Sequence, residues 1–544
     1  MPPRVRVKTS AGTVLGRQDA GVSVFWNIPY AAAPVGTGRF AAPVAPAPWS
    51  GVRDAGEPGP TAPAALRAGF GPLDMSALLG SGWATGEDYL GVNVWTPSPH
   101  RDRLPVMVYV HGGGFLNGSG RAELYDGTGF ARDGVVLVTL NYRLGVTGWL
   151  DVPGAPANRG LLDVIAALGW VRDNISGFGG DPDQVTVFGQ SAGAMIVAAL
   201  LAAPQAEGLF RRAISQSGSG LCAFAPRQAE RVTRAVAARL GIAPSAGAFA
   251  GIPDDRLVSA VAGLGPVDVT GDGHYDTSLG SSPFKPVLDG AVLSQQPVDA
   301  VAGGSGSAVD LLIGTNADEA NLYVVPAGRA ARITEAELAA AAARRHPDPV
   351  ALVAAHRAQR PDASPGELLA HLVTDAFTEG SRQLADAHAA RSAAGTHAYL
   401  FRWRPAAFGG SLGACHCVEL PFVFDRTELP GLRGPRALLG DGDLPPDLAS
   451  RMHRAWISFA ATGDPGWQPY RTEGRAEGRA EGRAEDRVED RTEDRAEERT
   501  EDRAEERAEE RTEGRVEDRA EDRAVQIIDV RWTMSQVRGA SSGA

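Results

Sequence analysis

The chain has few cysteines, three in 544 residues. So few thiols argue against a disulfide framework and favour a reducing compartment. Long apolar runs are absent as well, because the longest, VVLVTL at 135–140, has the length of a strand. The first residues, MPPRVRVKTSAGTVLG, lack the apolar core of a secretory signal. We therefore expect a cytoplasmic protein that does not bind a membrane.

An excess of basic residues is also missing, since the formal net charge is −12. Most of that charge lies in residues 471–522, where 13 Arg and 22 Asp and Glu give −9. The rest of the chain is nearly neutral and has no basic patch, so we expect no nucleic-acid partner. The hydrophobic content of 43% is typical of a globular protein.

Residues 471–522 form a tetrapeptide array in which Arg recurs at every fourth position from Arg471 to Arg519. The second position of each unit is Ala, Thr or Val, so the array has no apolar stripe that could pack on a core. A solvated helix or a disordered tether fits this pattern. The alternative is an arm that binds an unidentified partner.

Elsewhere, apolar runs of strand length alternate with helical patterns. Buried strands are predicted at 105–110, 135–142, 184–188, 212–218 and 309–315. Helices are predicted at 158–175, from the GQSAG run to about Ala203, and in the Ala-rich stretches 226–262 and 334–394. This alternation predicts an α/β fold with a mostly parallel sheet and ligands at the carboxyl ends of its strands.

The strongest local motif is Gly189-Gln190-Ser191-Ala192-Gly193, which lies between a predicted strand and a predicted helix. Glycines there allow a sharp turn that presents Ser191 above the sheet, beside the free amides of the helix N-terminus. A plain tight turn is the alternative, but the strand–turn–helix setting favours a nucleophile.

A second motif, HGGGF at 111–115, directly follows a predicted strand. Its glycines leave backbone amides free to face a developing oxyanion. A flexible linker is the other interpretation, although linkers rarely follow a buried strand at once. His111 fits a role in shaping the loop better than a role as a base.

These motifs resemble the type-B carboxylesterase family, the cholinesterase-like branch of the α/β-hydrolases, and in particular its bacterial para-nitrobenzyl esterase-like members. The similarity extends over nearly the whole chain except the array. Matching blocks include IPYAAAPVGTGRF (28–40), EDYLGVNVWTP (87–97), NYRLGVTGWL (141–150), FGGDPDQVTVFGQSAGA (178–194), LLIGTNADEANLY (311–323) and GACHCVELPFVF (413–424).

The resemblance implies an α/β-hydrolase fold with helical insertions around the mouth of the active site. It assigns the nucleophile to Ser191, the triad acid to Glu319 and the general base to His416, in the chain order expected for this fold. It also implies three oxyanion-hole amides and a supporting pair near the histidine, which are Gly113, Gly114 and Ala192, and Ser217 with Glu419.

The implied reaction is two-step acyl transfer to the serine and then to water, without a metal or cofactor. An imidazole base predicts activity that falls below about pH 6–7. We expect a small-molecule ester substrate, with a short- to medium-chain acyl group and an aryl or alkyl alcohol, and a monomer or weak homo-oligomer. Phe115, Trp83 and residues 221–224 are candidates for its pocket or for packing.

Three departures from the family pattern matter. Tyr89 stands where relatives usually have a cysteine, so the family's disulfide there cannot form. Gln190 replaces the commoner Glu before the nucleophile, which removes a charge but keeps the turn. The array replaces a short connection, and loop-closure entropy rises slowly enough for the fold to tolerate it. We predict a catalytic domain at 1–470, an insertion at 471–524, and a segment at 525–544 that completes the domain.

The stretch GACHCVEL at 413–420 sets Cys415 and Cys417 on either side of His416. Zinc binding is one interpretation, but a structural zinc site has four ligands and the only other cysteine, Cys222, is distant in sequence. We expect the two cysteines to be small packing residues, with thiol redox sensitivity as the alternative.

Other functions also fit parts of the pattern. The same fold includes non-enzymatic adhesion or scaffold proteins, but those lack the nucleophile. Shorter hormone-sensitive-lipase-like esterases share the HGGG motif, yet length, the Glu acid and the FGGDP block disfavour them. Amide or carbamate hydrolysis by the same triad remains an alternative.

Overall fold

A computed structural model describes residues 3–67, 69–80, 82–100, 103–271, 273–276, 282–471 and 528–529. Within these residues, no helix has both the length and the apolar character needed to cross a membrane. The predicted insertion lies outside the described residues from position 472 onward, as does most of the segment 525–544. Ile528–Asp529 forms the short strand β14, which pairs antiparallel with β13 at Leu400 and Phe401.

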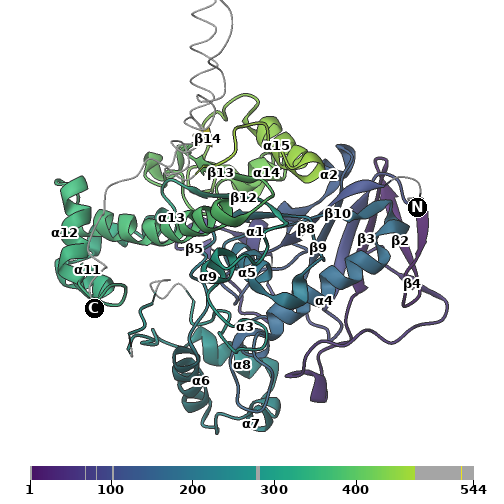
Figure 1. Cartoon of the computed structure of the whole chain (residues 1–544), viewed down its shortest axis with the longest axis horizontal. Coiled ribbons are helices and arrows are strands. Elements are labelled where there is room, and N and C mark those ends of the chain that lie inside the picture. Colours follow the sequence, from purple (N-terminus) through teal and green to yellow (C-terminus); the bar gives the residue numbers. More distant parts are fainter. Residues whose placement is uncertain are drawn as a thin grey trace, which may run out of the picture.

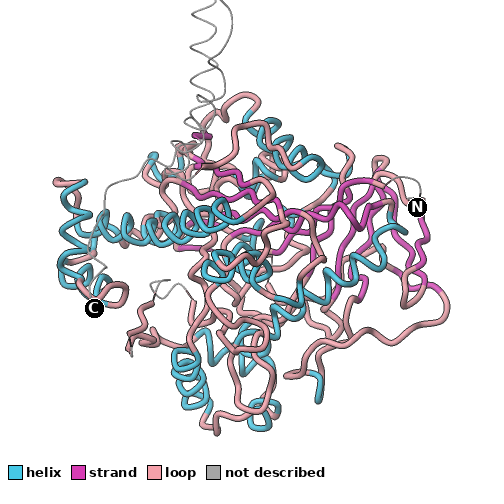
Figure 2. Tube along the Cα trace, viewed as in Figure 1, coloured by secondary structure: helices cyan, strands magenta, loops and turns pink. Residues whose placement is uncertain are grey.

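The centre of the molecule is a mixed β-sheet (Figures 1 and 2). Its order is β1-β2-β3-β7-β9-β8-β10-β11-β12-β13-β14, with β4 attached to β2. Strands β9 through β13 in this order are mutually parallel, whereas the pairs towards β1 and the pair with β14 are antiparallel. The described strands are β1 Arg4–Lys8, β2 Thr13–Asp19, β3 Val22–Pro29, β4 Val52–Asp54, β5 Gly69–Phe70, β6 Leu73–Asp74, β7 Gly91–Thr96, β8 Leu104–Val110, β9 Val136–Leu140, β10 Gly180–Gln190, β11 Arg212–Gln216, β12 Asp310–Asn316, β13 Thr396–Phe401 and β14.

Helices cover both faces of this sheet, and further helices lie at the periphery of the molecule (Figure 1). The described helices are α1 Ser76–Leu79, α2 Thr128–Arg132, α3 Gly145–Trp149, α4 Arg159–Asn174, α5 Ala192–Ala202, α6 Pro226–Leu240, α7 Ala246–Ala250, α8 Asp254–Ala262, α9 Pro297–Ala302, α10 Asn321–Val324, α11 Glu335–Ala343, α12 Pro349–Gln359, α13 Pro365–Arg391, α14 Leu420–Val423 and α15 Leu448–Thr462. The Ala-rich stretches are helical as predicted, and they form α6–α8 and α11–α13.

The alternation of side chains along β8 explains the two layers of helices. Val106, Val108 and Val110 lie in the apolar cluster that includes α4 and α5, while Met107 and Tyr109 lie in the cluster that includes α15. Successive strand residues point to opposite faces, so a continuous apolar run is required where both faces are covered. The predicted α/β sheet flanked by helices is therefore confirmed.

The five predicted strands and the predicted helices all occur, with one notable difference in length. Strand β10 begins at Gly180, four residues before the predicted start, because the polar residues Asp181 and Asp183 still follow the sheet. A register shift between Gly180 and Val185 interrupts its pairing with β8. This part of the strand contains polar residues and a proline, so the apolar pattern does not predict it.

Candidate active site

Ser191 occupies the sharp turn between β10 and α5. Its backbone has φ 58° and ψ −122°, a positive-φ conformation that is strained for serine. Close packing explains the flanking glycines, because a Cβ at Gly193 would lie 2.0 Å from the carbonyl oxygen of Val110. A Cβ at Gly189 would come within 2.6 Å of the Gly193 backbone. The predicted glycine-dependent turn therefore presents Ser191 at the carboxyl edge of the sheet.

The glycine loop after β8 lies beside this turn. Gly113 has φ 107°, and a Cβ there would lie 2.1 Å from the Asn117 carbonyl oxygen, so only glycine fits. The carbonyl of Gly114 accepts a hydrogen bond from the Ser282 hydroxyl at 2.5 Å. Together with Ala192 at the start of α5, both glycines line the cavity that contains Ser191.

His111 packs against the glycine loop and holds its conformation. Its ring is fully buried and stacks on Tyr142 at 4.5 Å between centroids, and Nδ1–H donates to the Gly112 carbonyl at 2.8 Å. Burial lowers the pKa of His111 to about 4, so the ring is neutral at physiological pH. These contacts agree with a structural rather than a basic role.

Glu319 and His416 meet at the same edge although they are far apart in the chain. Glu319 follows β12, and His416 lies in the connection between β13 and α14. Nδ1–H of His416 donates to a Glu319 carboxylate oxygen at 2.5 Å. The other oxygen accepts a hydrogen bond from the backbone N–H of Asn316 at 2.7 Å. Both side chains are at most 2% exposed, so water barely competes for this pair.

Gln190 contacts the opposite nitrogen of the imidazole. Its side-chain amide lies 3.1 Å from Nε2 of His416. Because Nδ1 carries the proton bound to Glu319, Nε2 is the acceptor and Gln190 is the donor. The ring is thus held in the tautomer that a general base requires.

A second buried carboxylate, Glu419, lies behind the histidine. It accepts hydrogen bonds from the side-chain amides of Asn316 at 2.6 Å and Gln216 at 3.3 Å. Burial, with the negative charge of Glu319, raises the pKa of Glu419 to about 7. The Ser217 hydroxyl is buried without a hydrogen-bond partner, so it does not bond to Glu419 in this structure.

Two adjacent cavities lie beside these groups. The smaller, of about 70 Å³, is lined by Ser191, the glycine loop, Ala192 and His416. The larger, of about 440 Å³, has mostly apolar walls and shares Arg67, Asn117 and Ser282 with the smaller.

The candidate pocket residues divide between these cavities. Phe115 borders the smaller cavity and Phe224 the larger. Trp83 and residues 221–223 line neither, so these residues belong to packing around the site.

The cysteines on either side of His416 are buried free thiols, as is Cys222. Burial raises the pKa of Cys415 and Cys417 well above the usual value, which keeps both thiols protonated. Among the residues that the structure describes, neither belongs to a convergent group of three potential metal ligands. This environment agrees with the predicted packing role.

Sequence reasoning missed several neighbours of the histidine. The sequence shows Gln190 as a departure from the family pattern, but not as a hydrogen-bond partner of His416. It does not indicate a role for Asn316. The rings of Tyr323 and Phe377 lie 5.7 Å and 4.9 Å from the imidazole, between centroids. The position directly after the predicted strand 309–315 is the only local signal for Asn316, which is the last residue of β12, and helical Phe377 carries none.

Comparisons with known proteins agree with this arrangement. Residues 3–476 match the carboxylesterase family. The chain is 38% identical to a para-nitrobenzyl esterase of Bacillus subtilis over 86% of its own length and 93% of the relative's. It is 35% identical to a phenmedipham hydrolase of Pseudarthrobacter oxydans, over 84% and 90%. A solved carboxylesterase of Geobacillus stearothermophilus superposes with a TM-score of 0.74 at 37% identity, covering 86% of this chain and 95% of that one.

Proposed function

The chain belongs to the carboxylesterase family, as a type-B carboxylesterase, and from this premise we propose that it hydrolyses carboxylic esters through Ser191, His416 and Glu319. One observation carries the proposal. The serine, at a strained strand–helix turn, and the imidazole, bound to a buried carboxylate, line the same cavity. That combination provides a nucleophile, its base and the group that orients the base.

In the first step, Nε2 of His416 takes the hydroxyl proton of Ser191 while the serine oxygen bonds to the ester carbonyl carbon. Glu319 stabilises the imidazolium that forms. The amides of Gly113, Gly114 and Ala192 bind the oxyanion, and each donor contributes about 2–4 kcal/mol to transition-state stabilisation. The carbon–oxygen bond to the alcohol then breaks, and the imidazolium returns its proton to the departing alcohol.

In the second step, water repeats the sequence on the acyl-enzyme. His416 removes a proton from water, whose oxygen bonds to the acyl carbon, and the Ser191 ester bond breaks as the proton passes to the serine oxygen. A carboxylic acid leaves and the free enzyme is restored. This route uses the described side chains, the three backbone amides and water.

The two cavities bear on the substrate class. The small cavity around Ser191 has room for the reacting ester and a short substituent, while the adjoining cavity can take a larger apolar group. Burial of apolar surface there contributes about 25 cal/mol per Å² to binding. We propose short- to medium-chain esters of aryl or alkyl alcohols as substrates.

Covalent labelling tests the assignment. A fluorophosphonate should attach one phosphonyl group per chain, on the peptide that contains Ser191, as hydrolysis of para-nitrophenyl butyrate is lost. The matching para-nitroanilide and carbamate, assayed alongside, separate ester from amide or carbamate hydrolysis. Full labelling at another residue, or labelling without loss of activity, would contradict the proposal.

Gln190→Glu provides a test of pH dependence. A carboxylate at 3.1 Å from Nε2 of His416 favours the protonated imidazole. Because the base must be neutral, the acid limb of the kcat/KM profile should move to higher pH, by about one unit. Rates measured from pH 5 to 9 give this limb. Gln190→Met removes the same donated hydrogen bond without adding a charge, so its limb should move less than that of Gln190→Glu. Equal limbs in the two variants would exclude an effect of the added charge on His416.

A further inference from the structure

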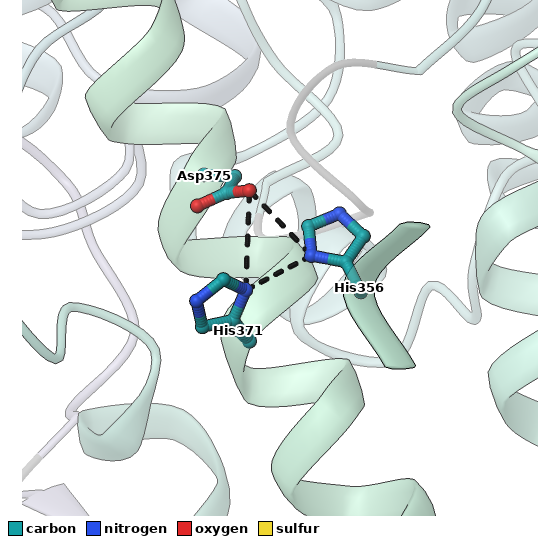
Figure 3. A group of neighbouring side chains, drawn as sticks. All are labelled: His356, His371 and Asp375. Carbon is teal, nitrogen blue, oxygen red and sulfur yellow. Dashed lines mark hydrogen bonds and ion pairs between the residues drawn. The ribbon is translucent and has the colours of Figure 1, made fainter. Parts of the chain in front are cut away.

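A cluster of three potential metal ligands lies outside the candidate active site (Figure 3). His356 comes from α12, and His371 and Asp375 come from one face of α13, four residues apart. In the described ranges, this is the only group of three or more His, Cys, Asp or Glu residues whose ligand atoms lie within 4.8 Å of one another. None of the three lines either cavity of the active site.

The geometry matches a small coordination sphere. The two Nδ1 atoms are 2.9 Å apart, and a carboxylate oxygen of Asp375 lies 3.6 Å from Nδ1 of His356 and 3.9 Å from Nδ1 of His371. Metal–ligand bonds of about 2.0–2.1 Å in a tetrahedron place ligand atoms about 3.3 Å apart. The three observed separations lie on both sides of this value, so small side-chain rotations would complete the site.

A shared proton cannot join all three groups of this cluster. The hydrogen bond between the two Nδ1 atoms needs a proton on one of them, so one imidazole must adopt the tautomer with hydrogen on Nδ1. A cation that replaces this proton would bind both nitrogens and the carboxylate at once. Figure 3 shows all three groups directed at one point between the helices.

The surroundings set the charge balance. Both imidazoles are held between α12 and α13, with side chains 8% and 20% exposed. Nearby Arg345 and Arg360 carry positive charges that oppose a cation, whereas Asp375 favours one. Two nitrogen ligands select a transition metal rather than calcium or magnesium.

We propose that His356, His371 and Asp375 bind one divalent transition-metal ion, with zinc as the best match. The two Nδ1 atoms and one carboxylate oxygen supply three ligands. Asp375 has a side chain that is 40% exposed, so water can supply the fourth. The other two side chains are 8% and 20% exposed, which shields the metal–nitrogen bonds.

The ion's role is structural, through α13. Thr374, next to Asp375, accepts the Ala320 amide at 3.2 Å, directly after Glu319. Two residues beyond Asp375, Phe377 packs on the imidazole of His416. An ion that joins α12 to α13 therefore stabilises the helix that backs the candidate active site. The proposed ester hydrolysis does not require it.

The test is zinc binding to the full-length chain after removal of metals with EDTA. Titration against a chromophoric zinc chelator should reveal one tight equivalent in the wild type. Asp375→Asn and His356→Ala should each weaken it at least about 100-fold, since loss of even a second-shell partner costs about 10–100-fold. Asp362→Asn removes an exposed carboxylate from the neighbouring loop and should leave binding unchanged.

Thermal unfolding provides the second measurement. Zinc should raise the melting temperature of the wild type and Asp362→Asn, but not of Asp375→Asn, because a ligand that binds only the folded state stabilises it. Weak binding by the acidic array is common to all variants and cancels in the comparison. Absence of a tight site, or equal tight binding in Asp375→Asn and His356→Ala, would overturn the proposal.

Discussion

Ser191→Ala is expected to lower kcat/KM for para-nitrophenyl butyrate by about 10⁴-fold or more, with the folded structure retained. Loss of the nucleophile removes the covalent route, and only the oxyanion donors and binding remain. The substitution is small and leaves the backbone bond from the Ser191 amide to Gln216 in place. Initial rates give the loss, and the melting temperature confirms the fold.

Ser217→Ala is the matched control for this experiment. Ser217 follows the adjacent strand β11 and, like Ser191, has a positive φ, 54° against 58°. Among the described residues, its hydroxyl has no hydrogen-bond partner, and Ser217 does not line the cavity around Ser191. Activity should remain within about tenfold of the wild type. A loss as large as that in Ser191→Ala would refute the assignment of the nucleophile.

Glu319→Gln should have the second-largest effect, about 10³–10⁴-fold in kcat. One carboxylate oxygen accepts the Asn316 amide and the other accepts Nδ1–H of His416, so both positions need an acceptor. The amide of glutamine supplies only one. If its NH₂ group faces the imidazole, Nδ1 becomes the acceptor and the proton moves to Nε2, which can no longer receive the proton of Ser191.

Glu419→Gln separates this tautomer effect from loss of a nearby charge. Glu419 is as deeply buried as Glu319, but its hydrogen bonds come from Asn316 and Gln216, not from the imidazole. Its pKa, raised to about 7, leaves it partly protonated at neutral pH, so the substitution changes less charge. Steady-state kinetics at pH 7 should show a loss within about tenfold. Equal losses in the two variants would argue against the role proposed for Glu319.

The local part of the site could be predicted because its causes are local. The run from Gly189 to Gly193 has a strand before it and a helix after it, and these neighbours dictate the turn. The same holds for the glycine loop after β8. Backbone conformation at such positions depends on a few adjacent residues, and the absence of Cβ atoms is visible in the sequence.

The remaining residues could not be derived in this way. Glu319 and His416 are 97 positions apart, and Gln190 is 226 positions from the histidine that it contacts. No periodicity links such pairs, and family resemblance alone suggested the first. Likewise, an Ala-rich helical pattern at 334–394 did not indicate that His356 would meet His371 and Asp375.

The α/β class, the sharp turn at Ser191 and the small number of cysteines and long apolar runs can be recognised from side-chain periodicity, glycine placement and composition, which act over short stretches. Which polar side chains share a site depends on the tertiary structure. The order of β8, β10, β11, β12 and β13 brings their carboxyl ends to one edge, and the packing of α12 on α13 turns three ligands inward. Contacts between residues that are distant in the sequence depend on how the whole chain buries its apolar surface.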